Sequence, residues 1–316
     1  MRILVTGAAG YIGGKLVESL CKKAWVEKVV GTDIREPAQG SSGYGFFKQD
    51  IREPLEEILD SENVDTVIHT AYVLPPLHDD NLMEDINKGG TRNVLRASVR
   101  AGVRQILYTS STTAYGFHPD NDFPLTEESP LRGNDDFTYA RNKREIENII
   151  RSFSTEYPHI TLSVVRPCFV VGPGFDNPLA RHLKKRIVLL PGHTKPFQFV
   201  HEDDLINVMV LLLKNRLGGI YNVAGEGTVT FPEMVNMLGN TPLPLPLRIL
   251  SPLNSLAWQL RLSAMTEFPS PVMNMMIHPW VATSEKLIRD TGYAFMYDSC
   301  EAFKDFVRHV RSHRQS

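Results

Sequence analysis

The sequence of 316 residues has few of the features that mark several common classes of protein. It holds only three cysteines, Cys21, Cys168 and Cys300, without metal-type spacing, so we expect neither disulfides nor a zinc site. No apolar run reaches the roughly 20 residues that span a bilayer. The 34 basic and 36 acidic residues give a net charge of −2, with no basic excess to attract nucleic acid. We therefore expect a cytoplasmic protein with a small-molecule substrate and no nucleic-acid or membrane partner.

What the first half does contain is an alternation of short β-branched runs with longer amphipathic stretches. The runs predicted as strands are residues 2–6, 28–32, 45–48, 66–70, 105–110 and 161–166. The stretches with apolar residues at three- and four-residue spacing, predicted as helices, are residues 12–23, 81–101 and 139–157. This alternation is typical of a parallel sheet covered by helices on both faces. The predicted fold class is therefore α/β, with a doubly wound parallel sheet.

The composition of the sequence changes after Pro167, where proline and glycine become frequent and the periodic spacing of apolar residues weakens. We expect residues 1–167 to form the sheet domain and residues 168–316 to form mainly a smaller C-terminal substrate-binding lobe. Within this lobe, residues 203–224 carry a helix pattern followed by a strand pattern, and we expect them to return to the main sheet. Residues 299–310 place their apolar side chains on one helical face, which predicts a packed helix.

The first predicted strand runs into a G-x-x-G-x-x-G motif, formed by Gly7, Gly10 and Gly13, at the start of a helix. Glycines here allow a tight turn and a close approach of the backbone to a pyrophosphate, which the N–H groups at the helix start can bind. Asp33 ends the second strand and is placed to accept hydrogen bonds from adenosine ribose hydroxyls. An acid there disfavours a 2′-phosphate, so we predict NAD over NADP, with Arg35 close enough to weaken the preference.

A second motif, Tyr139-x-x-x-Lys143, places two side chains on one face of a predicted helix, one turn apart. A lysine ammonium beside a phenol is expected to lower the tyrosine pKa from about 10, which suits Tyr139 to be a general acid/base. The hydroxyl cluster at residues 109–113 ends the fifth strand. Because ligands of open α/β sheets bind at the carboxyl ends of strands, one of these hydroxyls could orient a substrate oxygen.

Further short motifs follow in a fixed order along the chain. They are Asp50-Ile51, His69-Thr70-Ala71-Tyr72, Asn87 with Gly90-Thr91-Arg92-Asn93, Arg166-Pro167, Phe199-Val200-His201 and Tyr221-Asn222-Val223-Ala224. With the two motifs above, the chain resembles the extended short-chain dehydrogenases/reductases, also called the NAD-dependent epimerase/dehydratase family, over most of its length. The resemblance implies a Rossmann-type sheet, an NAD-dependent enzyme, and a homodimer formed through helices 81–101 and 139–157.

The resemblance also assigns roles to individual positions. Ser111 corresponds to the catalytic hydroxyl, Tyr139 to the acid/base and Lys143 to its partner, which also holds the nicotinamide ribose. The positions expected to contact the cofactor are Gly7, Gly10, Tyr11, Ile12, Gly13, Asp33, Ile34, Arg35, Asp50, Ile51, Thr70, Ala71, Tyr72, Asn87, Thr109, Tyr139, Lys143 and Pro167. In a dehydrogenation Tyr139 would take the alcohol proton while hydride leaves the same carbon, and an epimerase would use this step reversibly.

Two positions depart from the family pattern. Phe169 stands where many nucleotide-sugar enzymes have asparagine, and Phe197 where they have an arginine that holds the diphosphate. With Thr112 and Cys168, and together with residues 273–280, they are expected to line a less polar substrate pocket. The alternative that these aromatics are core residues is equally open. The cations that could bind a diphosphate from shifted positions are Arg181, Lys184, Lys185, Arg186 and Lys195.

Three functions remain open at this point. The first is a dehydrogenase or reductase that exchanges free NAD(H), the second a UDP-sugar 4-epimerase with tightly bound NAD, and the third a non-catalytic NAD-binding regulatory protein. The third is disfavoured because Tyr139 and Lys143 are both present, and a dehydratase because Thr112 and Thr113 replace the usual acidic pair. No metal site is predicted, since the histidines lack a second pair of ligands.

Overall fold

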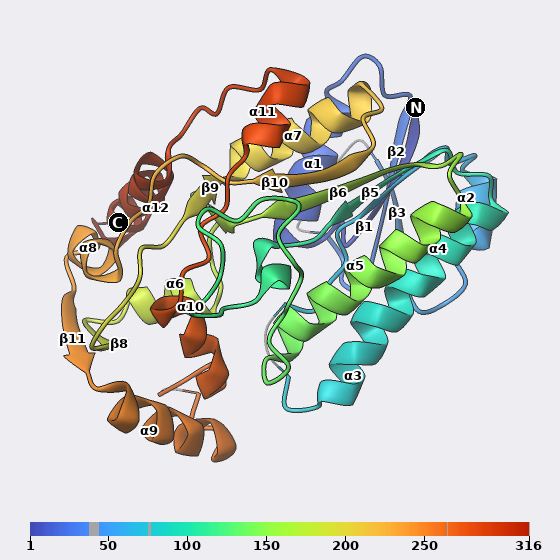
Figure 1. Ribbon diagram of the computed structural model, residues 1–316. Coiled ribbons are helices and arrows are strands. Elements are labelled where there is room, and N and C mark those ends of the chain that lie inside the picture. The colour runs from blue at the N-terminus through green and yellow to red at the C-terminus, as the bar shows by residue number, and fades with distance from the viewer. Residues whose placement is uncertain (38–43, 75–76, 264, 316) are drawn as a thin grey trace.

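The computed structural model describes residues 1–37, 44–74, 77–263 and 265–315 (Figure 1). Its centre is a seven-stranded sheet in the order β10-β6-β5-β4-β1-β2-β3, in which every pair is parallel. The strands are β1 (Arg2–Thr6), β2 (Lys28–Asp33), β3 (Gly45–Lys48), β4 (Thr66–His69), β5 (Gln105–Thr109), β6 (Thr161–Pro167) and β10 (Gly219–Val223). The strand order reverses at β1, which opens a crevice between the carboxyl ends of β1 and β4. This confirms the predicted doubly wound α/β class.

Helices cover both faces of this sheet (Figure 1). One face carries α1 (Tyr11–Cys21) and α7 (Glu202–Lys214), and the other carries α2 (Glu56–Ser61), α4 (Gly90–Arg100) and α5 (Thr138–Glu156). Successive residues of β1 point to opposite faces, so Ile3 and Val5 join the core under α1 while Leu4 joins the core under α4 and α5. Burial on both faces explains why the strands read as nearly continuous apolar runs.

The helix predicted for residues 81–101 is divided in the structure. It consists of α3 (Asp80–Glu84), a π-helical turn η1 (Asp85–Gly89) and α4. The turn contains Asn87, whose amide accepts from the Val73 N–H (2.8 Å) and donates to the Val73 carbonyl (3.3 Å). A tertiary contact therefore fixes this turn, and π turns are frequent at functional sites.

The remaining elements form a smaller lobe. They are β7 (Phe169–Val171), α6 (Pro178–Leu183), β8 (Ile187–Pro191), β9 (Phe199–His201), α8 (Phe231–Met237), β11 (Thr241–Leu245), α9 (Leu247–Gln259), η3 (Ser270–Met273), α10 (Asn274–Ile277), α11 (Glu285–Thr291) and α12 (Ser299–Gln315). Two short parallel pairs, β7 with β9 and β8 with β11, organise it. Residues 203–224 return to the main sheet, where α7 packs on α1 and β10 pairs with β6. The assignment of residues 168–316 to substrate binding stays a prediction.

Strand β11 forms although it contains Pro242 and Pro244. It pairs with β8 alone, and proline is tolerated at such a sheet edge because the missing N–H is not needed there. The flanking bonds from the Thr241 N–H to the Arg186 carbonyl (2.9 Å) and from the Gly192 N–H to the Leu245 carbonyl (2.8 Å) hold the pair together. A short strand therefore forms in this segment, although its irregular proline pattern does not predict one.

Candidate active site

The loop between β1 and α1 is shaped to receive a phosphate chain. Gly7 has a φ of +75°, and a Cβ atom there would lie 2.7 Å from the backbone of Ala71. A Cβ at Gly13 would overlap the carbonyl group of Gly7. Gly10 caps α1 without a side chain, so the first N–H groups of the helix remain available to an anion. These features fit the pyrophosphate of a dinucleotide.

Asp33 closes the same loop from the carboxyl end of β2. Its carboxylate accepts hydrogen bonds from the Ala9 N–H and the Arg35 N–H, both at 3.1 Å. The Arg35 side chain is 70% exposed, and its Nε lies 3.8 Å from the Asp33 carboxylate. The acid is therefore held in a fixed position where ribose hydroxyls of an adenosine could donate to it.

Glu202 also supports this part of the site, although the sequence patterns do not predict it. It begins α7, is almost fully buried, accepts a hydrogen bond from the Tyr11 hydroxyl and pairs with Lys15 Nζ at 2.8 Å. Its carboxylate also accepts from the Gly174 N–H at 3.2 Å. Burial and the charge of Glu202 raise the pKa of Tyr11. Glu202 thus ties helix α1 to the loop after β7, and an acid directly after the Phe-Val-His segment is the signal that could have found it.

Ser111 and Tyr139, the predicted catalytic hydroxyl and acid/base, line the same cavity. Ser111 caps the short helix η2 (Thr112–Tyr115), where its Oγ accepts from the Thr113 N–H at 3.1 Å. Burial raises the pKa of Tyr139 to about 12, against a smaller lowering by a hydrogen bond with Ser111. The expectation that Lys143 brings this pKa down is wrong here, because burial dominates and Ser111 is the group that opposes it.

Lys143 lies one turn further along α5. Its Nζ donates to the Thr109 carbonyl at 2.9 Å and sits 3.8 Å from the centre of the Tyr72 ring, but 5.8 Å from the centre of the Tyr139 ring. Burial lowers the pKa of Lys143 to about 7, against an opposing effect of Glu147. A lysine with a pKa near neutrality is typical of functional sites.

A buried ion pair fixes the elements that carry these residues. Glu147 on α5 and Arg166 on β6 are 3% and 1% exposed, and Arg166 Nε donates to both carboxylate oxygens at 2.9 and 3.0 Å. Ser110 donates to the same carboxylate, and Arg166 Nη1 donates to the Tyr115 hydroxyl at 2.7 Å. The pair therefore holds both ends of the segment that contains Ser111 and lies one helical turn from Lys143. No role was predicted for Glu147.

The structure brings most of the predicted site residues to one cavity of about 500 Å³. Those on its wall are Gly7, Gly10, Tyr11, Ile12, Gly13, Arg35, Thr70, Tyr72, Thr109, Ser111, Tyr139, Lys143, Pro167, Cys168 and Phe169. The predicted residues that do not line it are Asp33, Ile34, Asp50, Ile51, Ala71, Asn87, Thr112 and Phe197. The cofactor contacts of all these positions, on the wall or away from it, stay predictions.

Two residues predicted to line the substrate pocket lie behind its wall instead. Phe197 is fully buried, with its ring centre 5.1 Å from that of Phe169, and it bridges to Val229 through the backbone. Thr112 is also buried and donates to the Pro167 carbonyl at 3.4 Å. Both residues support the wall and do not form it, because their backbone segments direct the side chains into the core.

Away from the glycine loop, the cavity wall is largely apolar. Its aromatic, aliphatic and methionine side chains include Phe117, Phe137, Phe169, Phe175, Phe268, Leu179, Leu205, Val272, Met275, Met276 and Trp280, and Asp176 and Asn177 add polar groups. Arg181 and His182 also reach the wall, but Arg181 is held by Glu267, with Nε 2.7 Å from Oε2. Burial lowers the pKa of His182 and raises the pKa of the Cys168 thiol, so both are neutral at neutral pH. This part of the cavity therefore offers little to a strongly charged ligand.

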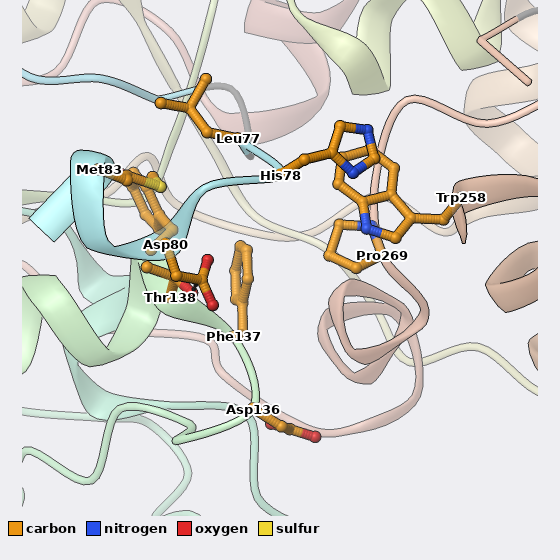
Figure 2. Close-up of a pocket in the computed structure, with 10 residues that line it drawn as sticks. Leu77, His78, Asp80, Met83, Asp136, Phe137, Thr138, Trp258 and Pro269 are labelled. Atoms are coloured by element: carbon orange, nitrogen blue, oxygen red, sulfur yellow. Dashed lines mark hydrogen bonds between the residues drawn. The ribbon is translucent and has the colours of Figure 1, made fainter. Parts of the chain in front are cut away.

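A second cavity of about 160 Å³ adjoins the first (Figure 2). Its wall is formed by Leu77, His78, Asp80, Met83, Asp136, Phe137, Thr138, Tyr139, Trp258 and Pro269. The rings of His78 and Trp258 are stacked, with their centres 4.1 Å apart, as Figure 2 shows. His78 precedes α3 and Trp258 belongs to α9, so the stack joins the sheet domain to the lobe. Because Phe137 and Tyr139 line both cavities, this contact lies at the rim of the active site.

Comparison with known proteins assigns the family. The model of the NAD dependent epimerase/dehydratase family matches residues 3–224, and this chain belongs to that family. The predicted family is thereby confirmed. Membership of a family defined by its dependence on NAD also confirms the predicted cofactor.

Individual relatives agree with this assignment. An uncharacterized protein of Mycobacterium tuberculosis is 24% identical over 315 residues, which cover 97% of this chain and 83% of that protein. UDP-glucose 4-epimerase of Thermotoga maritima, solved with UDP-glucose, is 19% identical to this chain with a TM-score of 0.77. The alignment covers 99% of this chain and 100% of the epimerase chain. UDP-glucose 4-epimerase of Thermus thermophilus, solved with NAD, is 23% identical, with coverages of 98% and 99% and a TM-score of 0.77. These likenesses show a shared fold.

The histidines in the family motifs have structural partners. The ring nitrogens of His69 lie 2.7 and 2.9 Å from the Thr6 and Thr91 hydroxyls, and burial lowers its pKa to about 3. His201 lies 3.2 Å from the Asp305 carboxylate. Among the residues that the structure describes, no group of three or more His, Cys, Asp or Glu could hold a metal ion. In the same part of the chain, no helix has both the length and the apolar character needed to cross a membrane.

Proposed function

We propose that this protein is an NAD-dependent oxidoreductase that moves a hydride between nicotinamide and the secondary alcohol or ketone carbon of a largely apolar substrate. The observation that carries this proposal is the aromatic and methionine wall of the cavity that Tyr139 and Ser111 line. A substrate rich in polar groups would leave those groups unpaired against this wall, at a cost in binding free energy. The cavity volume of about 500 Å³ suits a small organic molecule.

The residues that would hold NAD are those of the glycine loop, Asp33 and Lys143. The loop would bind the pyrophosphate, Asp33 the adenosine ribose, and Lys143 the nicotinamide ribose. When bound, NAD supplies the hydride acceptor, and NADH the hydride donor. The chain itself has to supply the proton, the orientation of the substrate and a cavity from which water is displaced.

Tyr139 is the group that handles the proton. Its pKa of about 12 keeps the phenol protonated at neutral pH, ready to donate to a ketone oxygen, while Ser111 can hold the same oxygen through a second hydrogen bond. In the opposite direction the phenolate must form, and the hydrogen bond with Ser111, which lowers the pKa of Tyr139, stabilises it. The pKa of Lys143 is about 7, so a substantial fraction of this side chain is cationic at neutral pH.

A second candidate is a UDP-sugar 4-epimerase, in which the same tyrosine would remove and return the proton of a sugar hydroxyl. It is favoured by the likeness to the UDP-glucose 4-epimerases and by Arg181, which reaches the cavity wall. Arg181 would have to leave Glu267 to hold a diphosphate, because its guanidinium is engaged by that carboxylate at 2.5 and 2.7 Å. Because of this ion pair, we favour the epimerase less than the oxidoreductase.

A cofactor and substrate assay separates the two candidates. Freshly purified protein is denatured and the released nucleotide is quantified by mass spectrometry; the native protein is then assayed with added NADH and a panel of apolar ketones, and with UDP-glucose alone. We expect little retained NAD and ketone-dependent consumption of NADH. Near-stoichiometric NAD together with interconversion of UDP-glucose and UDP-galactose would support the epimerase and contradict the proposal.

A further inference from the structure

Helix α9 presents a row of exposed apolar side chains. Ile249, Leu253, Leu256 and Leu260 are 47%, 52%, 54% and 60% exposed. Their spacing of four, three and four residues places them on one side of the helix, next to the buried side that carries Leu250. Single exposed leucines are ordinary on protein surfaces, but a continuous apolar row marks a contact surface.

The apolar row continues on the neighbouring strand pair. Ile187 and Leu189 of β8 are 56% and 40% exposed, and Leu243 of β11, which lies opposite Leu189 in the register, is 44% exposed. Helix α9 follows β11 almost directly and packs against β8, and Figure 1 shows all three elements at one edge of the molecule. We call the surface formed by these three residues and the row on α9 the α9 apolar face.

Acidic residues are scarce in the surrounding chain, although Asp176 and Glu267, at the borders of its two segments, pair with Arg181. The two segments that build this edge, residues 177–197 and 238–266, contain no aspartate or glutamate. Their seven cations are Arg181, Lys184, Lys185, Arg186, Lys195, Arg248 and Arg261. Arg186, Arg248 and Arg261 are exposed, although the whole chain carries a net charge of −2. A surface with apolar side chains beside exposed cations is complementary to a lipid bilayer, in which anionic headgroups cover an apolar interior.

We propose that the α9 apolar face docks peripherally on a lipid bilayer with anionic headgroups. The leucines would enter the boundary between headgroups and acyl chains, and the arginines would pair with the headgroups. A second copy of this chain fits the face less well, because a symmetric contact would bring the exposed Arg186, Arg248 and Arg261 of both copies together. The lack of a spanning helix, from which we expected no membrane partner, does not bear on a helix that lies on the surface.

The helix that carries the face and the segment after it contribute to the walls of the active-site cavities. The segment directly after α9 supplies Phe268 and Val272 to the cavity wall, and Trp258 of α9 lines the smaller cavity beside Tyr139. Docking would therefore bring the apolar cavity close to the lipid, where apolar alcohols and ketones concentrate. The docking itself does not rest on the proposed reaction, since it can be measured on protein that is not turning over.

Vesicle flotation of the purified full chain tests the proposal. The probes are vesicles of phosphatidylcholine with phosphatidylglycerol and vesicles of phosphatidylcholine alone. We expect the wild type to float with the anionic vesicles and to be released as salt is raised. The double variant Leu253→Glu/Leu256→Glu should lose at least about tenfold in partitioning, because two exposed leucines that would enter the bilayer become charged.

The chain offers a matched control in Ile288→Glu/Met296→Glu, which changes two side chains that are 45% and 52% exposed on another part of the surface. This control should float like the wild type, and all variants should keep the wild-type melting temperature. The proposal is overturned if the wild type floats with neither vesicle or if the two double variants lose binding equally. It is also overturned if light scattering shows a dimer that only Leu253→Glu/Leu256→Glu dissociates, without vesicle binding by the wild type.

Discussion

The buried ion pair between Glu147 and Arg166 allows a quantitative prediction of stability. The change Glu147→Gln keeps the shape of the side chain but removes the charge that faces a guanidinium only 1% exposed. Removing one partner of a buried pair costs about 3–5 kcal/mol, because the other charge stays buried without compensation. Folded proteins are stable by about 5–15 kcal/mol, so the variant should lose a large part of its free energy of unfolding.

Urea unfolding at neutral pH measures this loss as a lower midpoint at an unchanged slope. In thermal unfolding of a chain of 316 residues, the same loss corresponds to a decrease in Tm of about 5–8 °C. The matched control is Glu145→Gln on the same helix. Glu145 pairs with Lys88 at 2.7 Å, but its side chain is 34% exposed, so the control should lose less than about 1 kcal/mol.

The reasoning would be refuted if Glu147→Gln destabilised the protein no more than Glu145→Gln. A second variant examines the cause of the loss. In Glu147→Leu/Arg166→Met neither charge remains buried, so part of the free energy of unfolding should return relative to Glu147→Gln. A double variant that is less stable than Glu147→Gln would mean that the hydrogen bonds to Ser110 and Tyr115, and not the buried charge, determine the effect.

Three further predictions concern the cofactor loop and the catalytic lysine. Gly13→Ala should weaken NAD binding at least about tenfold in calorimetry, because the new Cβ would overlap the Gly7 carbonyl. The control Gly14→Ala should bind NAD normally, because its Cβ would lie 3.5 Å from the nearest atom. Equal NAD affinities of the two variants would contradict this geometry. Asp33→Ser should raise the ratio of NADP to NAD affinity at least about tenfold by removing a negative charge near the 2′-position, and an unchanged ratio would remove Asp33 from the site. Burial lowers the pKa of Lys143 from 10.5 to about 7, so between these pH values the unfolded chain binds more protons than the folded chain. The loss of stability caused by burying Lys143 therefore disappears as the pH rises toward 10.5. Lys143→Met should therefore raise the free energy of unfolding more at pH near 7 than at pH near 10.5; an equal gain at both would contradict the shift.

The central strands could be read from the sequence almost to the residue. Their β-branched runs are buried on both faces of the sheet, so the local pattern and the final environment agree. The division of helix 81–101 could not be read in the same way. The π turn depends on the contact between Asn87 and Val73, which no local periodicity encodes.

The gathering of Ser111, Tyr139 and Lys143 at one cavity was predictable for a similar reason. Tyr139 and Lys143 are neighbours on one helix, and Ser111 follows a strand whose end must face the crevice. Glu202 was missed because it meets Tyr11 across 191 residues of sequence, and Glu147 because its partner lies on another element. The predicted lowering of the Tyr139 pKa was wrong, because this pKa depends on burial, which motif spacing does not reveal.

Isotope transfer follows the proposed hydride step and the role of Tyr139 in one experiment. Wild type, Tyr139→Phe and the control Tyr157→Phe, at the other end of α5, are incubated with NAD and apolar secondary alcohols deuterated at the carbinol carbon, and the NADH is analysed by mass spectrometry. The account predicts singly deuterated NADH from the wild type and from Tyr157→Phe, and a rate at least about 100-fold lower in Tyr139→Phe with unchanged NAD binding. Equal transfer by Tyr139→Phe, or no transfer from any alcohol in a protein that epimerises UDP-glucose, would contradict it.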